Sequence, residues 1–131
     1  MNEQLFETPA VEGMPDHGLP LSPVVVHDGL VFLCGQVPRD AAGPTYPAVI
    51  SPEFGAQTHQ VMKNMKACLA AAGCGFEHVL KVNVFIQDWD NFKEFNEIYR
   101  QYFSHPLPVR TAVGADLHGF LIEVECIARQ P

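Results

Sequence analysis

The stretch LIEVECIA, residues 121–128, alternates between two kinds of side chain and predicts a β-strand with two unlike faces. One face is apolar and suited to packing on helices; it carries Ile122, Val124, Cys126 and Ala128. The other face mixes two carboxylates with two aliphatic side chains: Leu121, Glu123, Glu125 and Ile127. A fully solvated sheet surface is normally polar throughout, so this mixture indicates a face that is polar but partly covered.

The stretch VLKVNVFIQ, residues 79–87, divides in the same way. Its apolar face is made by Leu80, Val82, Val84 and Ile86, and its other face by Lys81, Asn83, Phe85 and Gln87. We therefore predict an α+β fold in which helices cover one face of a sheet. The mixed face favours a homo-oligomer whose sheets pack on one another across a wet interface. A monomer with a half-solvated sheet is the alternative.

The remaining strands follow from turn residues and apolar runs. Runs 24–26 and 30–34 flank His27-Asp28-Gly29, and Asp-Gly between β-branched runs is typical of a hairpin. Residues 109–115, VRTAVGA, predict a further strand. The Pro- and Gly-rich loop over 37–52 is longer than most structural connections, which favours a role at a site.

Two helices complete the pattern. We expect the first to begin with Ser51 as N-cap and Pro52 as first helical residue, and to end at Gly73. The second, over 91–103, is capped by Asp88 or Asp90 and carries an aromatic stripe: Phe92, Phe95, Tyr99, Tyr102 and Phe103. The order is β-β-α-β-α-β-β in a single domain, 1–131, behind an irregular arm of about residues 1–22.

Composition and charge argue against several classes of partner. The formal net charge of −7 disfavours binding to nucleic acid and to anionic membrane surfaces. No apolar run approaches the length of a membrane span. The chain begins MNEQLFET, without a secretion leader, so we expect a cytoplasmic protein whose four cysteines are reduced. The six histidines lack ligand-like spacing, so no metal site is expected.

One arginine stands out in PLPVRTAV, residues 106–113. A guanidinium does not lose its charge and is costly to bury without a partner, so Arg110 needs a carboxylate. Glu123 and Glu125 are the carboxylates of the closing strand pair, and on spacing alone a salt bridge to one of them is favoured. The other hypothesis is a site in which Arg110 binds the carboxylate of a ligand and a glutamate manages protons or water.

Several stretches together resemble the Rid (YjgF) family of reactive-intermediate imine and enamine deaminases. GLPLSPVV (18–25) resembles the family's G-P-Y-S-x-A element, and GLVFLCGQVPRD (29–40) its lvfvSGQiP. Residues 56–103 resemble its central helix, strand and second helix, LPVRT (107–111) matches P-x-R-[ST], and LIEVECIA matches vEIEaIA. The similarity spans about residues 19–128 and comes as an ordered series.

The resemblance implies a chorismate-mutase-like α+β fold, with two helices on one face of a mixed sheet, assembled as a homotrimer with sites in the clefts between subunits. It implies that Arg110 binds the substrate carboxylate and that Glu123 orients the hydrolytic water. It further assigns substrate-binding positions to Leu21, Cys34, Gly35, Asn96 and Thr111. The implied reaction is cofactor-free and metal-free hydrolysis of a 2-imino or enamine acid to a 2-keto acid and ammonia.

The chain departs from the family pattern at the pocket wall. Leu21 stands where the family has an aromatic residue, Cys34 where it has serine, and Ala112 where it often has cysteine. These changes leave two alternatives open: a larger unsaturated substrate of the aminomuconate kind and a non-catalytic ligand-binding trimer. The resemblance itself raises a third, RNA cleavage, which the acidic balance disfavours. We interpret Cys34 as pocket lining, because no base lies near it in the sequence.

Overall fold

The computed structural model describes residues 4–16, 18–40 and 49–131. Parts of the arm (1–3 and 17) and the middle of the proline-rich loop (41–48) lie outside these residues. The strands are β1 (Val24–His27), β2 (Leu30–Gln36), β3 (Val79–Ile86), β4 (Val109–Gly114) and β5 (Ile122–Arg129). The helices are α1 (Phe54–Ala71) and α2 (Phe92–Tyr99), with short 3₁₀ turns at Phe76–His78 and Trp89–Asn91.

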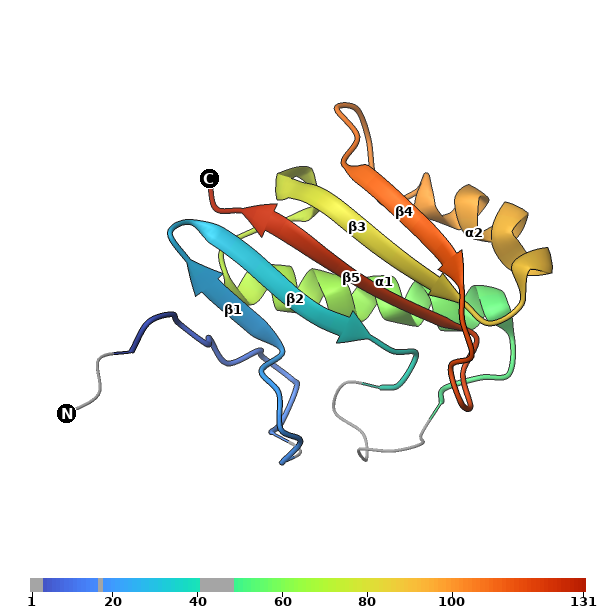
Figure 1. Ribbon diagram of the computed structural model, residues 1–131, viewed down its shortest axis with the longest axis horizontal. Coiled ribbons are helices and arrows are strands. Elements are labelled where there is room, and N and C mark those ends of the chain that lie inside the picture. Colours follow the sequence, from blue (N-terminus) through green and yellow to red (C-terminus); the bar gives the residue numbers. More distant parts are fainter. Residues whose placement is uncertain (1–3, 17, 41–48) are drawn as a thin grey trace.

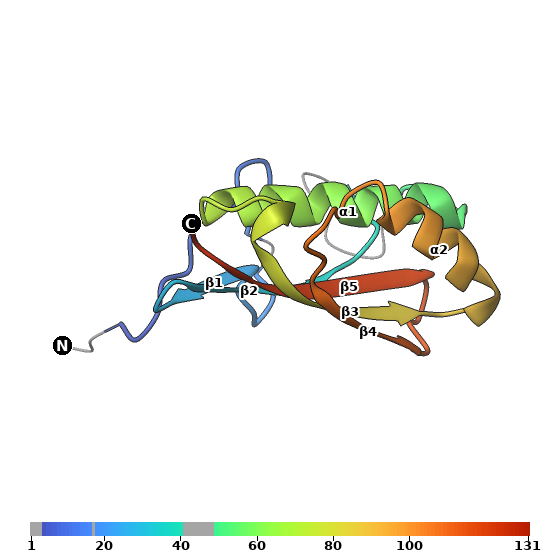
Figure 2. The same cartoon turned by 90° about the horizontal axis from the view of Figure 1, so that it is seen from above.

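The five strands form one mixed sheet in the order β1-β2-β5-β3-β4. All neighbours are antiparallel except β3 and β4, which are parallel and are joined through α2. Figure 1 shows α1 running behind the centre of the sheet, and Figure 2 shows both helices on the same face. The predicted fold, with two helices on one face of a mixed sheet, is confirmed.

The hydrophobic core lies between that face and the helices. The apolar face of β5, and that of β3 from Val82 onward, are fully or almost fully buried, in the way that their alternation predicts. From α1 the core receives the stripe of Val61, Met62, Met65, Cys68 and Leu69. The opposite side of the sheet, here called the open face, is less covered: Phe32, Val109 and Val113 are 38%, 67% and 42% exposed.

The hairpin is formed as predicted. Asp28 and Gly29 both have positive φ angles, 50° and 77°, as a two-residue turn between twisted antiparallel strands requires. The turn sets Val26 opposite Val31 and Val24 opposite Leu33. These four apolar side chains are buried, so the hairpin contributes its inner face to the core.

The face assigned to Leu80 is wrong. The β3–β5 register shifts between Val79 and Lys81, where β3 carries one residue more than β5. This bulge moves Leu80 out of the core, where it is 47% exposed, and Val79 takes the buried place. The assignments from Val82 onward are confirmed, because the register beyond the bulge is regular.

Helix ends differ from prediction by a few residues. Ser51 does not cap α1 directly: its Oγ accepts the backbone N–H of Glu53 at 3.1 Å, and Glu53 is the N-cap. The stop at Gly73 is confirmed, with φ +75° just beyond the helix. The second helix ends at Tyr99, and the chain continues through turns that keep Phe103 buried.

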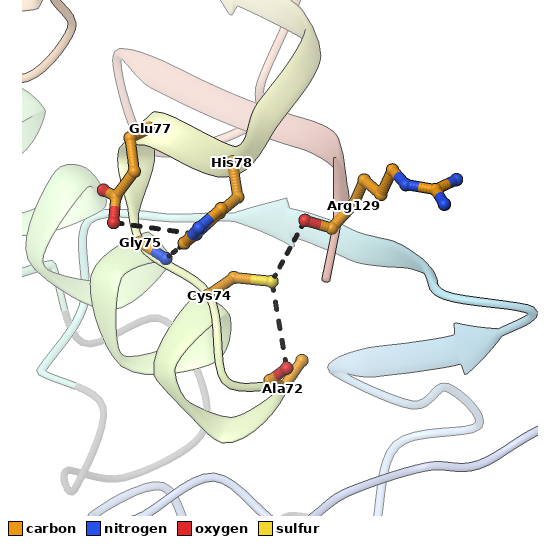
Figure 3. A network of polar contacts seen from close by, with 6 residues as sticks. All are labelled: Ala72, Cys74, Gly75, Glu77, His78 and Arg129. Carbon is orange, nitrogen blue, oxygen red and sulfur yellow. Dashed lines mark hydrogen bonds and ion pairs between the residues drawn. The ribbon is translucent and has the colours of Figure 1, made fainter. Parts of the chain in front are cut away.

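The turn after α1 ties that helix to the end of β5, as Figure 3 shows. The Cys74 thiol lies 3.8 Å from the carbonyl oxygens of Ala72 and Arg129. The backbone N–H of Gly75 donates to Nδ1 of His78 at 2.8 Å, which closes the following 3₁₀ turn. All four cysteines are free thiols, as expected. No helix in the described part of the chain is long and apolar enough to cross a membrane.

A pair of neighbouring residues on α1 tests the predicted core. Met65 is fully buried and Lys66 is exposed. Met65→Ala should lower the free energy of unfolding by about 2–5 kcal/mol through lost burial and a residual cavity, and Lys66→Ala by less than about 0.5 kcal/mol. Urea unfolding at one fixed protein concentration measures both. Equal effects would contradict the assignment of the Met65 face to the core.

Candidate active site

Arg110 lies on the helix side of the edge strand β4. It is in register with Val82, which is fully buried beneath the helices, and neighbours in register share a face. Its guanidinium carbon lies over three rings of α2, at 5.7 Å from the centroid of Phe92, 5.5 Å from Phe95 and 4.8 Å from Tyr99. These distances are within the range of cation–π attraction.

Among the residues that the structure describes, Arg110 has ring contacts but no carboxylate partner. In the described part of the chain no hydrogen bond or ion pair involves its guanidinium, which is only partly buried. Burial raises the pKa of Tyr99 to about 12, while the nearby Arg110 works against that rise. The Tyr99 hydroxyl therefore stays neutral at physiological pH, and the contact is cation–π in kind.

The salt bridge favoured by spacing alone is wrong within one chain. Glu123 is in register with Phe85 on the open face, whereas Arg110 is in register with Val82 on the helix face. Two strand spacings and three residues along the strand also put the two Cα atoms about 14 Å apart. The Arg110 guanidinium and the Glu123 carboxylate therefore lie on opposite faces of the sheet.

Glu123 lies against a bulge in β2. The β2–β5 register shifts between Leu33 and Gln36, so that two residues of β2, Cys34 and Gly35, face one residue of β5. A Cβ built on Gly35 would collide with the Glu123 carboxylate, so only glycine allows the carboxylate to lie over the backbone there. The bulge thus sets the place of Glu123.

Glu123 also lines a hollow of about 580 Å³ between the end of β2 and the irregular arm. Cys34, Gly35 and Leu21 line it too, so the structure brings together four of the sequence-predicted site residues. Further lining side chains are Met14, Leu19, Gln36, Asn64 and Phe120. Leu21 is 58% exposed and presents an aliphatic surface where the family pattern has an aromatic ring.

Two groups that line the hollow, Glu123 and Cys34, have raised pKa values. Burial raises the pKa of the Glu123 carboxyl, and the neighbouring Glu125 carboxylate raises it further. Burial likewise raises the pKa of the Cys34 thiol, partly opposed by a hydrogen bond from Gln36. A protonated thiol is a poor nucleophile, which supports the interpretation of Cys34 as lining.

The other predicted residues lie away from the hollow. Asn96 is on α2, one turn beyond Phe92, and is partly buried near the Arg110 side of the molecule. Thr111 is exposed on the open face, in register with Asn83, whose amide donates to Glu125 at 3.1 Å. Leu21, Cys34 and Gly35 therefore form a first group around Glu123, and Asn96 lies with Arg110 in a second. Thr111 belongs to neither group, because it faces the opposite side of the sheet from Arg110.

Sequence reasoning missed the polar side chains that hold the first group in place. Gln36 donates to the Cys34 carbonyl at 3.1 Å and so supports the bulge. Gln57, on the buried stripe of α1, accepts from the Leu121 N–H at 2.8 Å and fixes the entry to β5. An amide inside an apolar helical stripe is the signal that could have identified Gln57. The described residues contain no cluster of His, Cys, Asp or Glu suited to a metal ion.

Comparison with known proteins gives consistent results. The Endoribonuclease L-PSP family matches residues 14–130. Human 2-iminobutanoate/2-iminopropanoate deaminase is 37% identical over 113 residues, covering 85% of this chain and 80% of that protein.

Two solved structures share the fold. The crystal structure of YyfA, a Rid family protein of Yersinia pestis, has a TM-score of 0.85 at 28% identity and covers 95% of this chain and 98% of its own. Escherichia coli TdcF, crystallised with bound serine, has a TM-score of 0.81 at 28% identity, covering 95% of this chain and 99% of its own. This chain therefore belongs to the Endoribonuclease L-PSP family, also called the Rid or YjgF family.

Proposed function

We propose that this protein hydrolyses 2-imino and enamine acids to 2-keto acids and ammonia in clefts between the subunits of a homotrimer. The observation that carries the proposal is the guanidinium of Arg110, which has no carboxylate partner among the described residues and lies on the opposite sheet face from the Glu123 carboxylate. A second copy that placed its Glu123 hollow beside Arg110 would complete one site from two half-sites. The human relative named as an imine deaminase supports the reaction class.

The chemistry suits the two groups. Arg110 binds the substrate carboxylate through its planar fork and so fixes the orientation of the imine carbon. Glu123 accepts a proton from water as the water oxygen bonds to that carbon, which gives a carbinolamine. The proton then passes from Glu123 to the amino nitrogen, the C–N bond breaks, and ammonia leaves. Glu123 accepts the hydroxyl proton as the C=O bond of the ketone forms. No cofactor is required, because an iminium carbon is already electrophilic.

The lining of the hollow bears on the substrate. Leu19, Leu21 and Phe120 present apolar surface beside Glu123. We therefore keep a larger unsaturated amino acid, of the aminomuconate kind, as the alternative substrate. A non-catalytic binding protein is the alternative function, and absence of turnover in an otherwise folded oligomer would favour it. RNA cleavage is disfavoured, because a protein with a net charge of −7 does not attract the phosphate backbone of RNA.

Replacing the carboxylate-binding arginine tests the role of Arg110. Arg110→Ala should lower kcat/KM for 2-iminobutanoate by about 100-fold or more, since two charge-assisted hydrogen bonds are lost. Arg100→Ala, which removes an exposed arginine at the end of α2, should leave it unchanged. Ammonia release from imine generated in situ measures both, with uncatalysed decay subtracted. Full activity in Arg110→Ala would overturn the proposal.

Mixed oligomers test the shared site. Arg110→Ala and Glu123→Gln chains, co-expressed with different affinity tags and purified through both, should show about one third of wild-type activity, because each mixed trimer holds one intact site of three. Each variant alone should be nearly inactive. Mixed oligomers as inactive as their parents would mean that no site combines groups from two chains. Sedimentation of the same samples gives the number of subunits.

The raised pKa of Glu123 predicts a pH profile. Glu123 acts as a base only when ionised, so kcat/KM should fall as the pH decreases through its raised pKa. Glu125→Gln removes a neighbouring negative charge, which lowers the pKa of Glu123 and should move this acid limb to lower pH. Glu97→Gln, an exposed change on α2, is the control and should leave the limb in place. An identical limb in Glu125→Gln would argue against Glu123 as the base.

A further inference from the structure

We propose that the rings of Phe92, Phe95 and Tyr99, here called the aromatic bracket, act as positioning residues that hold the Arg110 fork ready for a carboxylate. The proposal rests on the proposed function, in which Arg110 binds the substrate. Its new content is that the arginine is oriented by aromatic faces rather than by a carboxylate of its own chain.

The bracket follows from helical spacing. Phe92, Phe95 and Tyr99 are three and four residues apart, which places them along one face of α2. That face turns toward β4, since all three rings lie within 5.7 Å of the Arg110 guanidinium carbon. In the sequence, this aromatic stripe is typical of a helix face that packs on the core. In the structure, its three rings also contact the Arg110 guanidinium.

Each ring of the bracket is itself held in place. Phe92 is stacked on Trp89, with centroids 4.3 Å apart and planes at 12°. Tyr99 is stacked on Phe103 at 4.4 Å and 21°. Phe95 is fully buried and contacts Tyr99 at 5.5 Å. Because the rings are packed against other rings or the core, they form a fixed support rather than a set of mobile contacts.

The chemistry of guanidinium makes such a support useful. Its faces are weakly hydrated and stack well on rings, while its N–H groups point outward along the edges. Ring contacts therefore restrict the arginine without occupying the donors that a carboxylate needs. A carboxylate from the same chain would restrict it equally well but would occupy those donors. The bracket thus orients Arg110 and leaves it able to bind a ligand.

A pair of ring-removing variants separates this role from a general loss of packing. Phe92 and Phe76 are both partly buried beside the core, but only Phe92 contacts Arg110; Phe76 packs on Tyr102 and Phe103. Phe92→Leu should lower kcat/KM for 2-iminobutanoate about threefold to tenfold, mainly through KM. Phe76→Leu should stay close to wild type. Equal losses in the two variants would overturn the positioning role.

The NMR signal of the Arg110 Nε–H group gives a readout that does not need turnover. It is assigned by its disappearance in Arg110→Lys, and ring currents should shift its proton upfield from the signals of Arg100 and Arg129. Phe92→Leu should reduce that shift, and Phe76→Leu should preserve it. A signal at the position of the other arginines, or one unchanged in Phe92→Leu, would overturn the bracket.

Titration with 2-oxobutanoate, the keto-acid product, links the bracket to binding. The ligand should shift the Arg110 signal in wild type and should bind about threefold to tenfold more weakly to Phe92→Leu. If wild type has no deaminase activity but shows both effects, the proposed function fails and the bracket stands. If 2-oxobutanoate leaves the Arg110 signal of wild type unchanged, the bracket does not present the arginine to carboxylates and the inference fails.

Discussion

The burial of one face of β5 is the constraint on which the rest of the structure depends. Ile122, Val124 and Cys126 are almost fully removed from water under the helices, and the two-residue period of a strand then sends Glu123 and Glu125 to the open face. On one side of β5, β3 pairs with it and shows the same alternation of faces. On the other side, the bulge near the end of β2 keeps that strand in register with β5. The position of the candidate base is thus a consequence of core packing.

The same constraint explains why the charged groups of the candidate site do not neutralise one another. A carboxylate pair, Glu123 and Glu125, is kept on one side of the sheet, where the charge of Glu125 and burial both disfavour ionisation of Glu123. The arginine is kept on the other side, among rings that attract its charge but accept no conventional hydrogen bond. Charges that are stabilised only in part by their own chain remain available to a ligand or to another subunit.

Much of the fold could be predicted from the sequence, because it depends on local periodicity. The hairpin at Asp28-Gly29, the strand alternation from Val82 onward and the end of α1 at Gly73 each have a local physical cause. The bulges at Leu80 and at Cys34-Gly35 could not be predicted, since an extra residue in a strand shows itself only against the register of its partner. The expected salt bridge failed for a related reason: spacing along the chain does not reveal on which face of the sheet Arg110 lies.

The parallel pairing of β3 with β4 has a consequence for how the molecule can vary. A parallel pair needs a crossover, so Arg110 and its rings are encoded in one contiguous β-α-β segment, residues 79–114. The wall around Glu123 is assembled instead from the arm, β2 and the start of β5, which are remote in sequence. Leu21 and Cys34, two of the departures from the family pattern, lie in segments that share no residue with the arginine unit, whereas Ala112 lies within it. Under the proposed function, the residues that accept the side chain of a substrate and the arginine that binds its acid group are thus encoded in largely separate segments.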